Sequence, residues 1–236
     1  MRFFFIFCIL TLSIFSCKKQ TVQKKKLVLA QNKVFTLNGT LENFYPKKVF
    51  LNKIIENSIY VLDSSNVIDN KFTIKGFVEY PERFALSFNE YSATVVLIIE
   101  NSDINIKIDA HNLEEPLIKG SELNSKLSEY KLNSKKIFKK IEYLFPQFQK
   151  YRLENNAEKL EDLGIEMSKI EQEYIDYSFN FIEKNRDSYI APMILRDQLK
   201  NSKIDTLKII NTFNQLSDKV KKSPDSQIIE LLLNLH

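Results

Sequence analysis

The stretch Lys71-Phe72-Thr73-Ile74-Lys75-Gly76 alternates polar with apolar or small residues at every step. This period of two is typical of a half-buried β-strand, because successive side chains of a strand point to opposite faces. Asp69 and Asn70 directly precede the stretch, and both residue types tolerate a positive φ. We therefore expect a strand at residues 71–76 that begins after a tight hairpin turn.

Comparable short runs, rich in β-branched and aromatic residues, occupy residues 27–109 on both sides of this strand. They are KLVLAQ, VFTLNGTL, KVFLN, SIYVLDS, KFTIKGFV, RFALSFN, ATVVLIIE and DINIKID. The pairs Asn38-Gly39 and Asp63-Ser64 have the composition of turns, and so has the polar stretch at residues 100–103. For residues 100–103 a cation site is the alternative. The spacing of the runs predicts an antiparallel β-sandwich or open barrel over residues 27–109.

The pattern changes after a short polar linker at residues 110–121. Apolar residues then recur every three or four positions in residues 122–236, which predicts an α-helical region. Two long antiparallel helices are expected, the first interrupted near Pro146 because proline lacks the amide hydrogen of a helix interior. Their apolar stripes are Leu123, Leu127, Tyr130, Ile137, Ile141 and Leu144, and Leu160, Met167, Ile170, Tyr174, Tyr177 and Phe181. The chain is therefore predicted to be α+β, a sandwich or barrel followed by a helical bundle.

Shorter helices are expected at residues 189–199, 204–216 and 225–235. The last has a clear beginning, with Ser223 as N-cap and Pro224 at the first helical position. Residues 228–235 form an unusually apolar run, IIELLLNL. We expect this run to pack on the bundle, and the alternative is a docking surface for a partner.

The first 16 residues have the organisation of a removed signal peptide, with basic Arg2, an apolar run at residues 3–15, and Ser16. The run is too short to cross a bilayer, since a spanning helix needs about 20 apolar residues. Ile14-Phe15-Ser16-Cys17 resembles a bacterial lipobox, in which the cysteine sulfur receives a diacylglycerol and the chain is cut before it. The alternative is an ordinary secretory signal with a chance cysteine.

This organisation predicts a lipoprotein signal peptide at residues 1–16 and a lipidated N-terminus at Cys17. Residues 17–26 then comprise the lipidated cysteine and a polar, lysine-rich tether that holds the body off the bilayer. We expect the protein to be lipid-anchored to the inner or outer membrane of the cell envelope, with its body facing the periplasm.

The residue inventory argues against several kinds of chemistry. Cys8 lies in the expected signal peptide and the sulfur of Cys17 would carry lipid, so no thiol is left for nucleophilic or dithiol chemistry. His111 and His236 have no second ligand at a metal spacing. The 4 glycines form no phosphate-binding loop, and a net charge of +4 does not indicate nucleic-acid binding. We therefore predict no catalytic, cofactor or metal residues, and no enzymatic activity.

A larger set of residues carries a resemblance to a known family. In order along the chain they are Phe35, Leu37, Gly39, Leu41, Val49, Leu51, Leu62-Asp63-Ser64, Asn70-Lys71-Phe72, Ile74, Gly76, Pro81, Glu100-Asn101, Ile104, Ile106, Gly120-Ser121 and Asn124. With this order and spacing the β-region resembles the domain of unknown function 4369, the N-terminal module of Bacteroidetes lipoproteins that often carry a thioredoxin-like, thiol-disulfide oxidoreductase domain behind it.

The helical region also resembles the segment that joins the two domains in such relatives, at Phe181-Ile182, Asn185 and Ser188-Tyr189-Ile190-Ala191-Pro192. The resemblance implies a thioredoxin-like domain with a Cys-x-x-Cys pair, which has no counterpart in this sequence up to His236. Two functions are thus expected, and a third hypothesis is a carrier of a small apolar ligand in the β-region. The first is a non-catalytic binding or scaffold module of the envelope, and the alternative is an accessory or truncated part of a thioredoxin-like oxidoreductase, with a thioredoxin-like envelope protein as partner.

Overall fold

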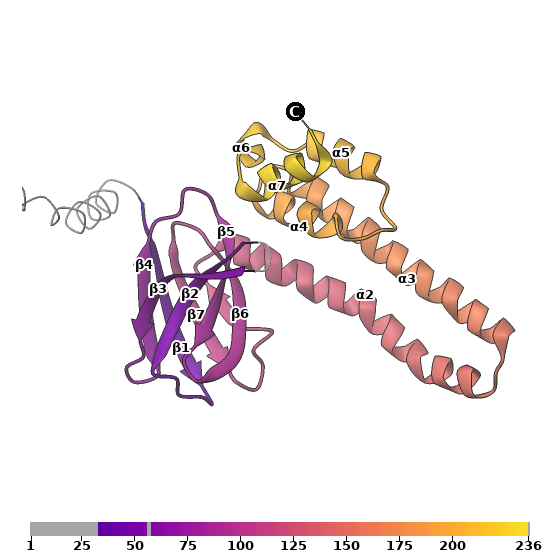
Figure 1. The fold of residues 1–236 in the computed structure, drawn as a ribbon, viewed down its shortest axis with the longest axis horizontal. Helices are drawn as coiled ribbons and strands as arrows, with labels where there is room; N and C mark the ends of the chain where they lie inside the picture. The colour runs from indigo at the N-terminus through magenta and orange to yellow at the C-terminus, as the bar shows by residue number, and fades with distance from the viewer. Residues whose placement is uncertain (1–32, 56–57, 236) are drawn as a thin grey trace, which may run out of the picture.

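A computed structural model describes residues 33–55 and 58–235. A β-sandwich lies at one end of the molecule and the helices lie at the other, so the predicted α+β class and the order of its two parts are confirmed (Figure 1). The expected signal peptide, Cys17, the tether, the first expected strand and His236 all lie outside the described residues. Among the described residues, no helix has both the length and the apolar character needed to cross a membrane.

The sandwich consists of two four-stranded sheets that do not close into a barrel. One sheet has the strand order β4-β1-β7-β8, and the other has the order β3-β2-β5-β6. Neighbouring strands are antiparallel except β1 and β7, which are parallel. The strands are β1 (Phe35–Glu42), β2 (Lys48–Ile55), β3 (Ser58–Asn66), β4 (Lys71–Gly76), β5 (Glu82–Phe88), β6 (Tyr91–Ile99), β7 (Asp103–Asp109) and β8 (Leu117–Lys119).

The alternation in the sequence determines which faces are buried. In β4, Phe72 and Ile74 point into the core between the sheets while Lys71, Thr73 and Lys75 are exposed. Asp69 and Asn70 have φ values of 50° and 57°, which confirms the tight turn predicted before this strand. The short strand β8 lies within the segment expected to be a linker and pairs with β7.

Two predicted turns are wrong. Asn38-Gly39 lies inside β1, where Gly39 pairs with Phe72 of β4 and Ile106 of β7. A Cβ atom at Gly39 would overlap the Phe72 ring, so the glycine provides room for an aromatic side chain of the core. Asp63-Ser64 lies inside β3, paired with β2. Turn composition was a poor guide at both places because pairing with neighbouring strands outweighs local preference.

The helices are α2 (Glu122–Leu153), α3 (Ala157–Lys184), α4 (Ile190–Gln198), α5 (Thr206–Asn214), α6 (Asp218–Lys221) and α7 (Pro224–Leu233). The predicted start of α7 is confirmed, since Ser223 is the N-cap and Pro224 is at the first helical position. The predicted interruption of the first helix is wrong, because α2 continues through Pro146. Pro146 and Glu142, whose carbonyl loses its helical partner, are both exposed, so water can satisfy that carbonyl.

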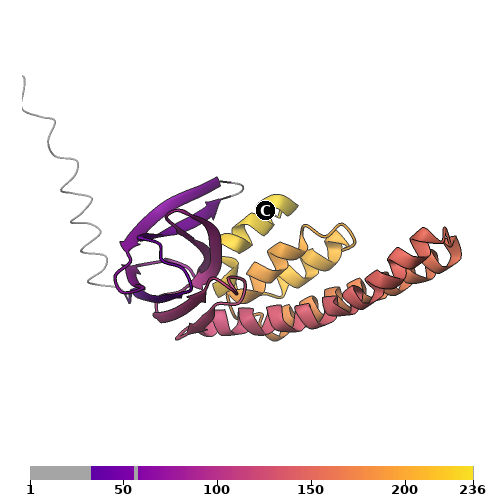
Figure 2. The ribbon, with the colours of Figure 1, turned by 90° about the horizontal axis from the view of Figure 1, so that it is seen from below.

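Helices α2 and α3 form a long hairpin whose base packs on α4 and α5, with α7 packed on α4, while the outer half of the hairpin projects from the body (Figures 1 and 2). We call residues 138–169 the arm. Within the arm only Leu163 is buried. The body and the arm therefore differ in physical character, because the body has a dense apolar core and the arm consists of two helices packed on one another.

Candidate functional site

The sandwich and the helices meet at the end of strand β6, where Leu97, Ile98 and Ile99 are all buried. Leu97 and Ile99 belong to the core of the sandwich, while Ile98 between them belongs to the helical core with Leu123 and Leu127. This explains why residues 97–99 are continuously apolar, since a strand end covered on both faces does not alternate. Strand β6 is thus a shared wall between the two parts of the molecule.

Asn124 of α2 attaches the helices to the backbone of β6. Its side-chain oxygen accepts a hydrogen bond from the Ile98 amide at 2.9 Å, and its side-chain nitrogen donates to the Ile98 carbonyl at 2.7 Å. Asn124 is 2% exposed, so these bonds form away from water. The side chain thus satisfies the N–H and the C=O of Ile98, two buried backbone groups at the sheet edge that would otherwise lack partners.

The beginning of α2 is defined by Gly120, Ser121 and Glu100. Gly120 has a φ of 82°, a conformation that favours glycine, and Ser121 is the N-cap, with its hydroxyl accepting from the Asn124 amide at 3.1 Å. A carboxylate oxygen of Glu100, in the bend after β6, accepts from the Ser121 hydroxyl at 2.5 Å and from the Leu123 amide at 3.3 Å. The carboxylate therefore binds the positive end of the helix dipole and fixes the direction of α2.

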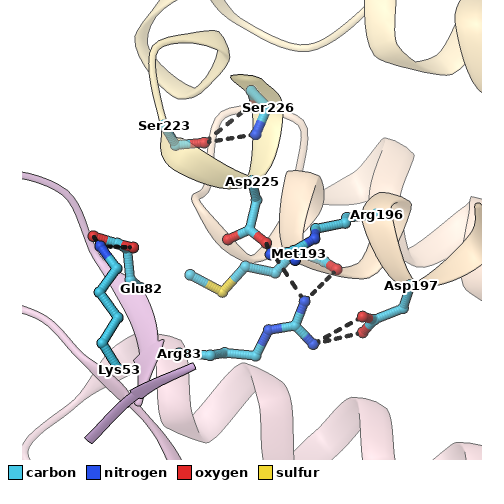
Figure 3. A network of polar contacts seen from close by, with 9 residues as sticks. All are labelled: Lys53, Glu82, Arg83, Met193, Arg196, Asp197, Ser223, Asp225 and Ser226. Atoms are coloured by element: carbon cyan, nitrogen blue, oxygen red, sulfur yellow. Dashed lines mark hydrogen bonds and ion pairs between the residues drawn. The ribbon is translucent and has the colours of Figure 1, made fainter. Parts of the chain in front are cut away.

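A second attachment is a network of charged side chains between β5, α4 and α7 (Figure 3). Nη1 of Arg83 donates to both carboxylate oxygens of Asp197, at 2.9 and 2.7 Å, and Nη2 donates to the Met193 carbonyl at 3.0 Å. Nη2 also lies 3.5 Å from Asp225, whose side chain is 5% exposed. Arg196 donates to the same Asp225 oxygen at 3.0 Å. One arginine of the sandwich thus contacts two different helices.

In this network the positive charges of Arg83 and Arg196 face the negative charges of Asp197 and Asp225. Burial lowers the pKa of Arg83, but the contacts with Asp197 and Asp225 outweigh burial and raise it overall, so the guanidinium stays charged. The neighbouring Lys131 of α2 has a lowered pKa, first because it is partly buried and second because Arg83 repels its charge. The geometry supports a structural joint rather than acid–base chemistry.

A shallow cavity of about 350 Å³ lies beside the joint, where Pro81, the start of α2 and the end of α3 meet. Its lining carries charges of both signs, and several of them have partners within the protein. Glu122 pairs with Lys126 at 2.9 Å, and Lys219 lies over the ring of Tyr189 at 5.2 Å. Glu100 at its edge is engaged at the start of α2.

The arm exposes large apolar side chains. The exposed fractions are 67% for Tyr143, 58% for Phe145, 84% for Leu153 and 51% for Ile165. Phe138 and Phe145 are seven residues apart and therefore lie on one face of α2, where Phe138 packs on Tyr174 with ring centroids 4.6 Å apart. Exposed apolar side chains on a projecting element are candidates for contact with another molecule.

The residues that the sequence offered as possible metal ligands are not brought together in a site. His111 is exposed, and its Nδ1 lies 3.3 Å from an Asp109 oxygen. The described part of the chain contains no group of three or more His, Cys, Asp or Glu side chains that could bind a metal. Residues 228–235 are divided, because Ile229 is buried in the helical core while Leu231 and Leu232 are exposed.

The functional geometry that sequence reasoning missed is the joint itself. Arg83, Asp197 and Asp225 are far apart in the chain, and nothing in their local sequence indicates that they meet. Asn124 and Ser121 were noticed only through the family resemblance. A polar residue within the apolar stripe of α2 was the one available signal, since a buried asparagine needs partners for its amide.

Residues 35–127 match the model of a family described as "Domain of unknown function (DUF4369)". The match covers all eight strands and the first turns of α2, including Ser121 and Asn124. No curated protein and no solved structure matches the chain.

Proposed function

Because residues 35–127 belong to the family of the domain of unknown function 4369, we propose that this protein is a non-catalytic binding or scaffold module of the cell envelope. In this proposal a lipid on Cys17 anchors the chain, the sandwich supports the helices, and the arm contacts a partner. The observation that carries the proposal is the arm, which projects from the body and exposes Tyr143, Phe145 and Leu153.

The charges on the arm and on the adjoining turns of α2 and α3 support a role in recognition. Residues 135–153 of α2 carry Lys135, Lys136, Lys139, Lys140, Lys150 and Arg152 against Glu142. Residues 157–173 of α3 carry Glu158, Glu161, Asp162, Glu166, Glu171 and Glu173 against Lys159 and Lys169. One side of the hairpin is thus basic and the other is acidic, an arrangement that orients a partner with complementary charges.

The joint supports a scaffold role because it determines where the arm points. Asn124 and Glu100 direct the base of α2, and Arg83 connects the sandwich to α4 and α7. An arm attached in this way holds a bound partner at a defined position relative to the sandwich. A loosely linked domain would lose orientational freedom when a partner binds, and this loss has an entropic cost.

The second candidate function is an accessory part of a thioredoxin-like oxidoreductase. It is motivated by the family resemblance and by the exposed Leu231 and Leu232 at the end of α7, which offer a second apolar surface. In this case the partner of the arm or of α7 would carry a Cys-x-x-Cys pair.

Site-specific photo-crosslinking tests the binding function. A benzophenone amino acid at Phe145 should capture a partner in intact envelopes of the native host. The same group at Tyr45, which is 69% exposed on the sandwich, is the matched control and should capture much less. Mass spectrometry of the captured protein distinguishes the two candidates, since a Cys-x-x-Cys protein favours the accessory role. Equal capture from both positions would contradict a partner surface on the arm.

The anchor is tested separately. A Cys17→Ser variant should leave the membrane fraction and lose the mass increase of lipidation, whereas Cys8→Ser should change neither. Membrane association that persists in the Cys17→Ser variant would exclude a lipid anchor at this residue.

A further inference from the structure

Strand β3 forms an open edge of the second sheet. It pairs with β2 on one side, and no strand among the described residues pairs with its other side. Natural edge strands are usually protected from pairing with other chains by lysine or proline, by shortness, or by a covering element. Strand β3 is 9 residues long, and residues 58–62 read Ser-Ile-Tyr-Val-Leu, with neither charge nor proline.

The first half of β3 is also exposed on both faces. The exposed fractions are 62% for Ile59, 51% for Tyr60, 61% for Val61 and 52% for Leu62. The paired residues of β2 continue this surface, since Ile54 is 42% and Ile55 is 49% exposed. These residues form a two-stranded ribbon that the core of the sandwich does not cover, and such a ribbon is only marginally stable by itself in water.

A β-bulge separates this ribbon from the rest of the sheet. Leu51 pairs with Asp63 but Asn52 pairs with Val61, so Leu62 is an extra residue in β3. A bulge bends a strand and increases its twist, and the residues beyond this one are exposed. The free edge at residues 58–61 is therefore accessible to another strand.

We propose that this edge pairs with the same edge of a second copy of the chain, so that two sandwiches share one continuous sheet. The pairing is antiparallel about a two-fold axis at Tyr60, which places Ile59 opposite Val61 of the second copy and Ser58 opposite Leu62 of the second copy. The segment suits self-pairing because no charge faces a like charge in this register. A two-fold contact requires such self-complementarity, since each residue meets its partner twice. We call this contact the edge dimer.

A second copy suits this edge as the occupant, because it brings a segment of the same length that also lacks charge. Edge pairing joins the two backbones and covers the flanks of residues 58–62 while both faces of the ribbon stay open, so less than the roughly 1,200 Å² of a standard interface is buried. An interface of this size is weak, so the edge dimer should depend on concentration. A bilayer is a poorer occupant, because the sequence between Ile55 and Ser58 includes Glu56, whose carboxylate would be costly to place in lipid.

This proposal does not rest on the lipid anchor or on a partner of the arm. Its test is the mass of the full chain by sedimentation equilibrium in density-matched detergent under reducing conditions. The wild type should shift from monomer to dimer as its concentration rises, and Val61→Lys should remain monomeric. Ile68→Lys is the matched control, because Ile68 is 71% exposed beyond the end of β3 and this variant should still dimerise. Circular dichroism verifies that both variants are folded.

A disulfide test locates the axis. In a chain with Cys8→Ser and Cys17→Ser, Tyr60→Cys should form a covalent dimer on mild oxidation, because opposite residues of paired strands are within the Cα distance of a disulfide. Lys75→Cys, exposed on β4, should not.

Four results would overturn the edge dimer. They are a wild type that is monomeric at every concentration, a dimer that persists in Val61→Lys, open-ended aggregates that disappear in Val61→Lys, and binding to lipid vesicles that this substitution abolishes. The third result would indicate an aggregation-prone edge without a two-fold contact, and the fourth would indicate a lipid surface as the occupant.

Discussion

The strongest test of the joint is the substitution Arg83→Met, which removes the guanidinium while keeping most of the apolar stem. The wild-type side chain donates to Asp197 and to the Met193 carbonyl and lies 3.5 Å from Asp225. After the substitution, Asp197 can be solvated because its side chain is 42% exposed. Asp225 retains its bond to Arg196. The variant should therefore fold, with a weaker connection between the sandwich and the helices.

The magnitude follows from the exposure of each contact. The pair with Asp197 is about half screened by solvent and contributes about 1 kcal/mol. The bond to the Met193 carbonyl and the attraction to the buried Asp225 are charge-assisted and contribute roughly 1.5 to 3 kcal/mol together. We expect a total loss of about 3 kcal/mol, which for a domain of this size lowers the midpoint of thermal unfolding by roughly 6 to 12 °C.

Urea unfolding and hydrogen exchange measure this loss. Faster exchange should appear at the amides of β5, β6 and α4, while the strands of the opposite sheet change little. Lys53→Met is the control, because Lys53 and Glu82 form a partly exposed pair at 2.8 Å within one sheet, and we expect its loss to cost less than 1 kcal/mol. If Arg83→Met costs no more than Lys53→Met, the network does not connect the two parts as argued here.

Three further substitutions test other parts of the structure. Gly164→Ala should stabilise the protein by about 0.5 to 1 kcal/mol in urea unfolding, because Gly164 is inside α3 and an added Cβ meets nothing within 4 Å. Gly39→Ala is the control and should be destabilising, because its Cβ would overlap the ring of Phe72 in the core. Equal effects of the two substitutions would contradict this explanation. Asn124→Ala should lower the free energy of unfolding by about 2 to 4 kcal/mol, because the backbone N–H and C=O of the buried Ile98 both lose their partner. A loss below about 1 kcal/mol would show that water replaces the side chain. Burial raises the pKa of the Tyr130 phenol. As the pH rises above about 10, this phenol therefore loses its proton first in the unfolded chain, and the folded state loses stability. Tyr130→Phe should lessen this alkaline loss in urea unfolding at neutral and high pH, and an unchanged pH dependence would refute the assignment.

Much of the fold could be predicted because local patterns in this sequence are strong. The alternation in β4, the turn at Asp69-Asn70 and the capping of α7 by Ser223 each depend on a few neighbouring residues. The two long apolar stripes are long enough to indicate helices without knowledge of what they contact. These features depend on residues that are close to one another in the sequence.

The errors arose where distant contacts decide the conformation. The pair Asn38-Gly39 has the composition of a turn but lies in the middle of β1, because β4 and β7 pair with this strand on its two sides. Pro146 was expected to interrupt α2, but it lies on an exposed surface where the missing hydrogen bond can be replaced by water. In both cases the competing influence comes from the tertiary environment of the residue.

The sequence by itself determined the order of the two parts, the faces of most strands and helices, and the scarcity of residues suited to thiol or metal chemistry. The tertiary structure alone decided that β6 is a wall shared by two cores, that Arg83 meets Asp197 and Asp225, and that the arm and the outer edge of β3 remain uncovered. The physical reason is that hydrophobic periodicity is a local property, whereas the pairing of charges and the covering of a surface depend on which distant segments come together.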